Sequence, residues 1–493
     1  MMTTPLEVVP QMEGFSRWAD RASVFDRTGH VEVPMKRLSS ARVLWKNPRY
    51  AELDAVFSAR AVPSSEADDH LLRHCAYRIA QPGESADLHA HADRYGGAGI
   101  GLNGGSGRAV CLGGYHLKGI GRTALVSSRI GFAHASGGAF LEECVREAVF
   151  SELVAKTFPH QAVPTLALID SGEVQVWPTE FGPKVEHKVL LVRPQFVRPA
   201  HFQRAVAHIG DSPLVGSHDQ RRVALMFDSL IGQLGLAVVP ELFSRFAENW
   251  ARQIAHGFIA RLLHSSYTTS NVTMEGRLLD FGAMSAVPSW ANIWTMRQPQ
   301  PLASMFAKVE AALRDLNFYI DRYVSPQAAT PDCHSGRVAR AREAWERQLD
   351  LGLLEFAGVH NATAWYTSFD EMALKRYRSA RQGVFDHYQA SRIDFYDSRI
   401  EPSDWDIDSL WAKPLNPALE RLSGFLRSSD TNPSEADAHL RKRTSSMRRL
   451  YREVAKQEIY DALDGPHEVD ASAVTEVIDE LVQIGLAASG QRE

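Results

Sequence analysis

The sequence lacks an excess of positive charge. Its 493 residues carry 54 lysines and arginines against 59 aspartates and glutamates, which gives a formal net charge of −5. A protein that binds nucleic acid or an anionic membrane surface normally shows a basic footprint. We therefore expect neither a nucleic-acid nor a membrane partner.

Cysteine is scarce as well. The four cysteines, Cys75, Cys111, Cys144 and Cys333, are scattered, and no two of them have the CxxC spacing. Disulfide frameworks and cysteine-rich zinc sites normally show regular, closely spaced cysteines. We expect free thiols in a reducing compartment, no zinc site and a cytoplasmic protein.

Long apolar runs are also missing. No stretch approaches the twenty residues of a membrane-spanning helix, and the first residues lack the basic and apolar regions of a signal peptide. The composition, 44% hydrophobic and 23% charged, is typical of a globular protein. The length allows one large two-lobed domain or two to three smaller ones.

The chain divides into a glycine-rich, strand-rich part and a helical part, with no visible internal repeat. From Tyr95 a glycine-dense stretch precedes short apolar runs, and beyond residue 200 apolar residues recur at helical spacing. We predict an α+β, protein-kinase-like two-lobed fold with a β-rich N-lobe and a helical C-lobe. The expected segments are 1–90, an N-terminal extension packing on the lobes; 91–199, the N-lobe with its glycine-rich loop; 200–410, the C-lobe with the metal site; and 411–493, a C-terminal helical segment.

The hydrophobic periods predict individual elements. The expected strands are 109–112, 115–118, 165–170, 173–177 and 187–192, with a turn at Ser171 and Gly172, and one helix is expected over 140–154. The expected helices beyond residue 200 are 218–234, 240–263, 302–324, 337–355, 370–392 and 436–463, with a further apolar period over 468–488. Residues 331–336 are expected to form an exposed loop.

The stretch from His264 to Gly282 carries the clearest chemistry. Asn271 lies on a loop after an apolar helix, and Asp280 ends a short apolar run nine residues later, which we expect to be a buried strand. Together, an amide oxygen and a carboxylate can hold one hard cation, which prefers oxygen ligands. Protein kinases hold magnesium with a catalytic-loop Asn and the Asp of Asp-Phe-Gly. We predict a magnesium (or manganese) site at Asn271 and Asp280.

Gly105, Gly107 and Arg108 precede the first strand of the expected N-lobe. Glycines let the backbone approach phosphates, and arginine offers a bidentate fork. A flexible surface loop is the alternative. Arg193 and Arg198 follow a later strand and are candidates for a phosphate clamp, with exposed surface arginines as the alternative.

Lys118 ends an apolar strand. A strand lysine that faces a cleft can neutralise phosphate charge and be positioned by a helix carboxylate; a solvated strand-end lysine is the alternative. Glu147, on the helix that follows, is the expected partner. Glu142 and Glu143 compete for that role, and a solvated helix face is the alternative for all three.

The order of these motifs resembles the SelO (YdiU) family, pseudokinase-fold enzymes that adenylylate other proteins. Gly-Ser-Gly-Arg-Ala at 105–109 is similar to the family's Gly-Asp-Gly-Arg-Ala, and Leu-Lys-Gly-Ile-Gly-Arg-Thr at 117–123 to its Leu-Lys-Gly-Ala-Gly-x-Thr. Further similar segments, in the same order, are 145–152, 163–168, 193–202 and 264–280. The matches cover about residues 90–300 and are weaker over 38–56 and 447–452.

The resemblance implies roles for the matching positions. Lys118 would contact phosphates beside Glu147, and Asn271 and Asp280 would bind magnesium. The implied ATP-binding residues are Gly105, Gly107, Arg108, Lys118, Ser136, Gly137, Arg193 and Arg198. In this family ATP lies reversed relative to ordinary kinases, so AMP passes to a Ser, Thr or Tyr hydroxyl of a protein or peptide acceptor (AMPylation) and pyrophosphate leaves.

Three positions depart from the family pattern. Ser270 replaces the family's proposed proton acceptor, Ser136 replaces an aspartate that contacts the nucleotide, and Leu191 aligns with the first clamp arginine, which Arg193 is placed to substitute. A general base contributes roughly 10²–10⁴-fold, and serine cannot act as one at neutral pH. His264, another acid or the substrate itself are candidate replacements. The alternatives are a phosphotransferase, an adenylating enzyme acting on a small molecule or peptide, and a degenerate nucleotide-binding pseudoenzyme.

Overall fold

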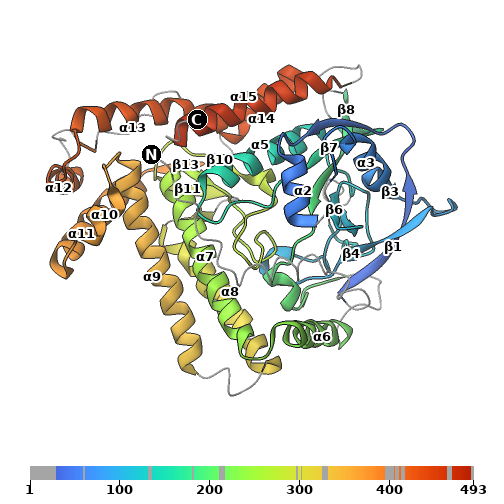
Figure 1. The fold of residues 1–493 in the computed structure, drawn as a ribbon, viewed down its shortest axis with the longest axis horizontal. Helices are drawn as coiled ribbons and strands as arrows, with labels where there is room; N and C mark the ends of the chain where they lie inside the picture. Colours follow the sequence, from blue (N-terminus) through green and yellow to red (C-terminus); the bar gives the residue numbers. More distant parts are fainter. Residues whose placement is uncertain are drawn as a thin grey trace.

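The computed structural model of the chain describes residues 29–58, 62–130, 136–179, 182–209, 217–295, 298–300, 302–324, 331–394, 405, 410–411, 417–463 and 469–489. In Figure 1 the strands of the large sheet gather on one side of the molecule and most of the long helices on the other. Helices α13 (Pro433–Met447), α14 (Arg452–Leu463) and α15 (Ala471–Ser489) run along one edge of both.

One eight-stranded antiparallel sheet forms the β-rich lobe. Its strands are β1 His30–Arg37, β2 Arg42–Lys46, β3 Tyr77–Ile79, β4 Leu88–Asp93, β5 Ala109–Leu112, β6 Tyr115–Lys118, β7 Ala167–Thr179 and β8 Gly182–Pro194. They pair in the order β2-β7-β8-β6-β5-β4-β1-β3. The expected turn at Ser171 and Gly172 is wrong: β7 continues through it, and only the register with β8 shifts between Asp170 and Val174.

Both faces of the sheet are buried, which explains the continuous apolar run of β8. Val189 and Leu191 contribute to a core with α5 (Leu141–Thr157) and α15 (Ala471–Ser489). Leu190 and Val192 contribute to a second core with α2 (Tyr50–Ser58) and α3 (Ala67–Cys75). Alternate residues of a strand point to opposite faces, so a strand covered on both sides is apolar at every position.

The helical lobe surrounds one large apolar core. Its helices are α6 Ser217–Leu234, α7 Val238–Ala260, α8 Leu302–Tyr323, α9 Pro331–Phe356, α10 Ala362–Thr367, α11 Glu371–Gln389, α12 Pro417–Leu426, α13 Pro433–Met447, α14 Arg452–Leu463 and α15. Short strands lie among them: β9 Leu262–Leu263, β10 Ser285–Ala286, β11 Asn292–Thr295, β12 Gln298–Gln300 and β13 Arg392–Asp394.

Two helix boundaries differ from the sequence prediction. Helix α9 begins at Pro331, so residues 331–336 are helical rather than a loop; proline is well tolerated in the first turn, where its missing N–H has no helical partner. The helix expected over 436–463 is two helices, α13 and α14, separated by a 3₁₀ turn at Arg448–Leu450.

The strand expected before Asp280 is reduced to single bridges from Leu278 to Ala162 and Val272.

The predicted α+β class is confirmed, and the arrangement of a β-rich lobe and a helical lobe agrees with the kinase-like prediction. Strands β1, β2 and β3, which precede residue 90, belong to the same sheet as β5 to β8. The boundaries at 90, 199 and 410 stay predictions, and residues 1–28 lie outside the described part of the chain.

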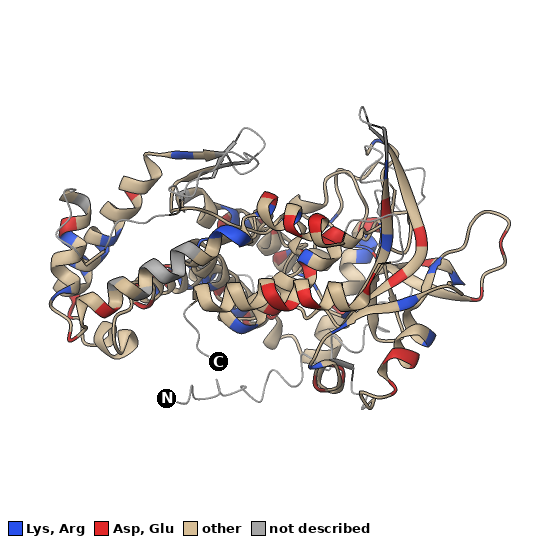
Figure 2. Cartoon of the chain, turned by 90° about the horizontal axis from the view of Figure 1, so that it is seen from above, with Lys and Arg blue, Asp and Glu red and all other residues tan. Residues whose placement is uncertain are grey.

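Charged residues of both signs are interspersed over the elements (Figure 2). Among the described residues, no single helix has the length and apolar character needed to cross a bilayer. By length and composition alone, the pair of α6, from His218, and α7, bent by 104°, passes that test together.

Candidate active site

Lys118 is the centre of the site. It ends β6, after a tight turn at Gly113 and Gly114 that joins β5 to β6. The residue is 3% exposed. Its ammonium group lies 2.7 Å from Glu147 Oε1, 2.9 Å from Glu143 Oε1 and 2.6 Å from Asp280 Oδ1. The predicted pairing of the strand lysine with Glu147 is therefore present in the structure.

Helix α5 supplies two carboxylates rather than one. Glu143 and Glu147 are four residues apart, so they lie on the same helix face. Glu143 also accepts two hydrogen bonds from the Arg108 guanidinium, at 2.6 and 3.0 Å. Glu142 lies on another face and pairs with Arg146. Of the two competitors to Glu147, Glu143 thus contacts Lys118 and Glu142 contacts a different cation.

Asp280 and Asn271 are held together by their backbones. The Leu279 N–H donates to the Asn271 carbonyl at 3.2 Å. Asp280 adopts a left-handed conformation (φ 66°, ψ 66°), which is uncommon for a residue other than glycine and occurs often at functional sites. The Asn271 amide nitrogen donates to Ser266, so the amide oxygen is the side-chain atom left for a cation. One carboxylate and one amide oxygen fit magnesium, which is held by few protein oxygens together with phosphates.

His264 braces this loop. Its Nε2 lies 2.8 Å from the Leu279 carbonyl, to which it donates, and the side chain is fully buried. Burial lowers the pKa of His264, so the ring is neutral at pH 7. It positions the residue before Asp280 and does not line the cavity described below, which argues against it as a proton acceptor for a bound substrate.

Arg193 and Arg198 are buried rather than surface arginines, with 3% and 4% exposure. Arg198 donates to the Ser270 carbonyl at 2.8 Å and lies over the rings of Tyr95 and Phe196. Arg193 Nε and Nη1 and Arg198 Nε have no hydrogen-bond partner among the described residues. Buried guanidinium donors without partners are costly, and a bound anion satisfies them.

The glycines before β5 are required by packing. A Cβ atom on Gly105 (φ 153°) would lie 2.0 Å from the Asp93 carbonyl, and one on Gly107 would lie 2.7 Å from Val126 Cγ2. The loop is anchored by Ser106, whose N–H donates to the Asp93 carbonyl at 2.8 Å. The stretch is therefore a fixed wall of the site rather than a free surface loop.

These side chains converge on one cavity of about 530 Å³, a size typical of small-molecule sites. The predicted site residues that line it are Gly105, Gly107, Arg108, Lys118, Arg193, Arg198, Ser270, Asn271 and Asp280. Glu147 lies behind Lys118. Ser136 and Gly137, predicted to contact nucleotide, do not line this cavity; the Gly137 carbonyl accepts from the Gly121 N–H. Residues 131–135 of the same loop lie outside the described residues.

Burial and charge act in opposite directions on the central groups. Burial raises the pKa of Asp280, but the charges of Lys118, Arg193 and Arg108 outweigh it and hold that pKa well below its usual value. Burial lowers the pKa of Lys118, yet the surrounding carboxylates, Asp280 first, raise it above its usual value. Burial raises the pKa of Glu147 against the lowering effect of Lys118, and Asp280 adds to the rise. Lys118 and Asp280 are thus both charged at neutral pH.

Sequence reasoning missed two side chains that line the cavity, Tyr95 and His116. It left Glu143 as an alternative to Glu147, and in the structure Glu143 contacts both Lys118 and Arg108. Tyr95 opens the glycine-dense stretch and His116 lies two residues before Lys118 in β6, on the same face of the strand. That spacing was the available signal for His116.

Several bacterial protein nucleotidyltransferases are similar to part of this chain. The protein nucleotidyltransferases YdiU of Xanthomonas euvesicatoria pv. vesicatoria (strain 85-10), Xanthomonas oryzae pv. oryzae (strain PXO99A) and Aromatoleum aromaticum (strain DSM 19018 / LMG 30748 / EbN1) are 28%, 26% and 28% identical over 198, 200 and 206 residues. Each match covers 39% of this chain and 38% of the relative. No protein-family profile matches the chain.

The match defines the class: over this part the chain is a divergent relative of nucleotide-transferring proteins. The predicted resemblance to the SelO (YdiU) family is thereby confirmed. Because the chain spans well under half the length of the relatives it matches, the activity of the whole protein is a proposal.

Proposed function

We propose that this protein transfers AMP from ATP, with magnesium, to a Ser, Thr or Tyr hydroxyl of a protein acceptor and releases pyrophosphate. The observation that supports this most is the convergence of Lys118, Arg193 and Arg198 with Asn271 and Asp280 on one cavity. Such a set can neutralise a triphosphate and hold its metal, and transfer at phosphorus depends mainly on positioning and electrostatic stabilisation.

Each side chain has a separate task in this proposal. Lys118 and the buried arginines bind phosphate oxygens; Glu143 and Glu147 hold Lys118 in place. Asn271 and Asp280 would hold magnesium, which supplies charge neutralisation to the phosphates. The acceptor oxygen bonds to the α-phosphorus, the bond from that phosphorus to the bridging oxygen breaks, and pyrophosphate leaves with the electron pair. The acceptor proton passes to solvent or to a group of the acceptor, because Ser270 cannot take it at neutral pH.

A second cavity supports the presence of an acceptor. It measures about 730 Å³, shares Ile100, Gly101, Leu102 and Ser266 with the first cavity, and has mainly apolar walls that include Trp250 and Tyr267. Thr268 and Thr269, next to Ser270, line it as well. An acceptor side chain seated there would adjoin the nucleotide.

Mass spectrometry of the protein after incubation with magnesium and ATP tests the proposal. We expect a gain of AMP on the chain itself or on added protein, and label from α-labelled ATP but not from γ-labelled ATP on the acceptor. A gain of phosphate would instead establish a phosphotransferase. Free pyrophosphate with adenylated small molecules would establish an adenylating enzyme.

One observation favours a second candidate, a protein that binds nucleotide without turnover. Ser270 Oγ lies 2.8 Å from Thr268 Oγ1, so a hydroxyl pair replaces a carboxylate at the family's base position. Magnesium-dependent ATP binding without label transfer to any acceptor would establish this candidate. We place either activity in the cytoplasm on the cysteine usage alone, and secretion of the protein from its native cell would contradict that assignment.

A further inference from the structure

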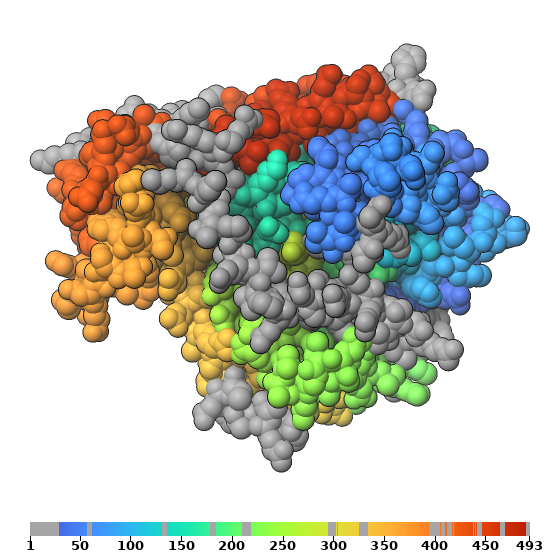
Figure 3. Space-filling view, viewed as in Figure 1, coloured from blue at the N-terminus to red at the C-terminus, as the bar shows by residue number. Residues whose placement is uncertain are grey.

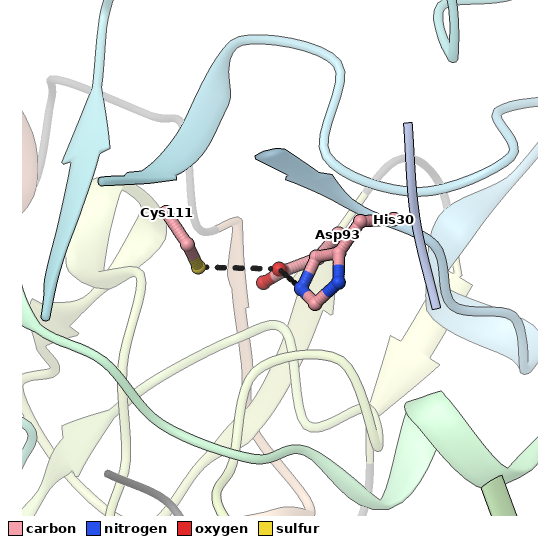
Figure 4. Close-up of side chains that lie close together, drawn as sticks. All are labelled: His30, Asp93 and Cys111. Atoms are coloured by element: carbon pink, nitrogen blue, oxygen red, sulfur yellow. Dashed lines mark hydrogen bonds and ion pairs between the residues drawn. The ribbon is translucent and has the colours of Figure 1, made fainter. Parts of the chain in front are cut away.

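His30, Asp93 and Cys111 form a compact group of side chains of metal-binding types (Figure 4). His30 comes from β1, Asp93 from the end of β4 and Cys111 from β5. His30 Nε2 lies 3.1 Å from Asp93 Oδ1, and Cys111 Sγ lies 3.2 Å from the same oxygen. All three side chains are about 95% buried or more.

Among the described residues, no arginine or lysine forms an ion pair with Asp93. Its ion pairs in the described part of the chain are with three histidines: His30 at 3.1 Å, His201 at 3.7 Å and His116 at 3.9 Å. Asp93 Oδ2 has no hydrogen-bond partner among the described residues. A buried carboxylate in such surroundings is costly without a cation.

The available donors match a borderline-soft divalent metal. Imidazole nitrogen, carboxylate oxygen and thiolate sulfur are the ligands of zinc, at about 2.0–2.3 Å each. One ligand atom from each of His30, Asp93 and Cys111 lies within 4.8 Å of the other two, so small side-chain movements bring one ion to all three. A bound metal displaces the proton of the Cys111 thiol. One carboxylate and one thiolate then balance two positive charges.

Two histidines compete for the fourth position. His201 Nδ1 accepts the Arg198 N–H at 2.9 Å, so its Nε2 carries the proton and is a donor toward Asp93 rather than a ligand. His116 is 1% exposed and its Nε2 has no hydrogen-bond partner among the described residues. Arg193 Nη2 lies 3.5 Å from His116 Nδ1, and because arginine only donates, this contact likewise places the proton of His116 on Nε2. Neither histidine is therefore assigned as a fourth ligand.

We propose that His30, Asp93 and Cys111 bind one zinc ion or a similar transition-metal ion, separate from the magnesium site. The three ligands come one each from β1, β4 and β5, so the ion links three neighbouring strands. The expectation of no zinc site rested on cysteine spacing, and a site that takes one ligand per strand leaves no such spacing. This inference does not depend on the proposed transfer of AMP.

Elemental analysis of the full-length chain, purified without a histidine tag, tests the site directly. We expect one zinc per chain, removed by a strong chelator with a fall in Tm and restored by added zinc. Cobalt(II) in its place is expected to give a thiolate-to-cobalt absorption band. Because both measurements use the unmodified chain, they do not depend on the folding of a variant.

Matched variants assign the ligands. Cys111→Ser should abolish the cobalt band, whereas Cys75→Ser, which alters a buried thiol on α3, should keep it. His201→Gln should weaken zinc binding by about 10–100-fold through loss of its contact with Asp93. Asp280→Asn should keep the ion.

An unmodified chain that contains no transition metal and takes up neither zinc nor cobalt would overturn the proposal. Retention of the cobalt band in Cys111→Ser would overturn it as well. In both cases the group would be a buried hydrogen-bond cluster around Asp93 instead.

Discussion

Lys118 Nζ and Asp280 Oδ1 lie 2.6 Å apart, although 162 residues separate them along the chain. The predicted phosphate-binding lysine and the predicted metal-binding carboxylate thus neutralise each other. When magnesium binds Asp280 and a phosphate binds Lys118, the ion pair between the two side chains is replaced by two ion pairs with the ligands. If only one ligand binds, the other side chain loses its partner. Magnesium and ATP are therefore expected to bind with positive coupling.

The first prediction concerns Asp280. Asp280→Asn should abolish the magnesium dependence of ATP binding and of transfer, because the hard cation loses its carboxylate. The variant should remain folded, since Lys118 keeps Glu143 and Glu147. Calorimetric titration of ATP with and without magnesium measures the effect, with exposed Asp386→Asn as the matched control. Unchanged magnesium-dependent turnover would refute the metal assignment.

The second prediction concerns the ion pair of Lys118 and Glu147. Both side chains are buried, so Lys118→Met leaves Glu147 without its main partner and should lower the free energy of unfolding by about 3–5 kcal/mol. Adding Glu147→Gln should recover part of that loss, because it removes the unpaired negative charge of Glu147. Urea unfolding of the two single variants and the double variant gives the coupling energy. A double variant no more stable than Lys118→Met would show that the stability lost in Lys118→Met does not come from the unpaired Glu147 carboxylate.

Much of the site was predictable because its signals are local. Lys118 ends an apolar strand, and Asn271 and Asp280 lie nine residues apart between a helix and a short apolar run. Glu143 could not be separated from Glu142 and Glu147 by sequence. Which helix face meets the sheet depends on tertiary packing, and Arg108 from the glycine-rich stretch completes the contact.

The fold was less predictable before residue 90. Strands β1 and β4 pair with each other over six residues and carry few large apolar side chains, so they give no strong strand pattern. In the assembled sheet they lie between β5 and the edge strand β3. Figure 3 shows the red C-terminal helices along one edge of the molecule, next to the blue N-terminal part. The break between α13 and α14 was missed because apolar residues continue at helical spacing through it.

The third prediction concerns Arg193. Its Nε and Nη1 have no hydrogen-bond partner among the described residues, so we expect them to donate to the phosphates of ATP. Arg193→Met should then weaken ATP binding by roughly 10- to 150-fold, the equivalent of about 1.5–3 kcal/mol for a hydrogen bond to a charged group. Stability should change little, because burial costs the Arg193 cation more than its 3.9 Å contact with Glu147 returns, as the lowered pKa of Arg193 indicates. Nucleotide titration and urea unfolding check both, with exposed Arg245→Met as the control. Loss of stability with intact ATP affinity would assign Arg193 a structural role.

The fourth prediction concerns Ser270 and rests on the proposed transfer of AMP. Ser270→Asp places a carboxylate at the family's base position and should raise the rate of transfer, by at most about 10²–10⁴-fold. The asparagine of Ser270→Asn has nearly the same shape as aspartate but cannot accept the proton of the acceptor hydroxyl, so this variant should not raise the rate. Initial rates with α-labelled ATP decide between them. A fall in rate for Ser270→Asp would indicate that the pair of Ser270 and Thr268 shapes a specialised acceptor site.

The fifth prediction is a loss of stability on acidification. Burial, followed by the charges of Arg252 and Arg277, lowers the pKa of His160 from 6.5 to about 4. In the unfolded chain His160 becomes protonated below about pH 6.5, whereas in the folded chain it stays neutral down to about pH 4. The free energy of unfolding therefore falls as the pH falls through this window. His160 contributes about 3 kcal/mol at most. His160→Gln should flatten the decline in urea-unfolding free energy between pH 7 and pH 5, and exposed His89→Gln should leave it unchanged; equal slopes for all three chains would contradict the assignment.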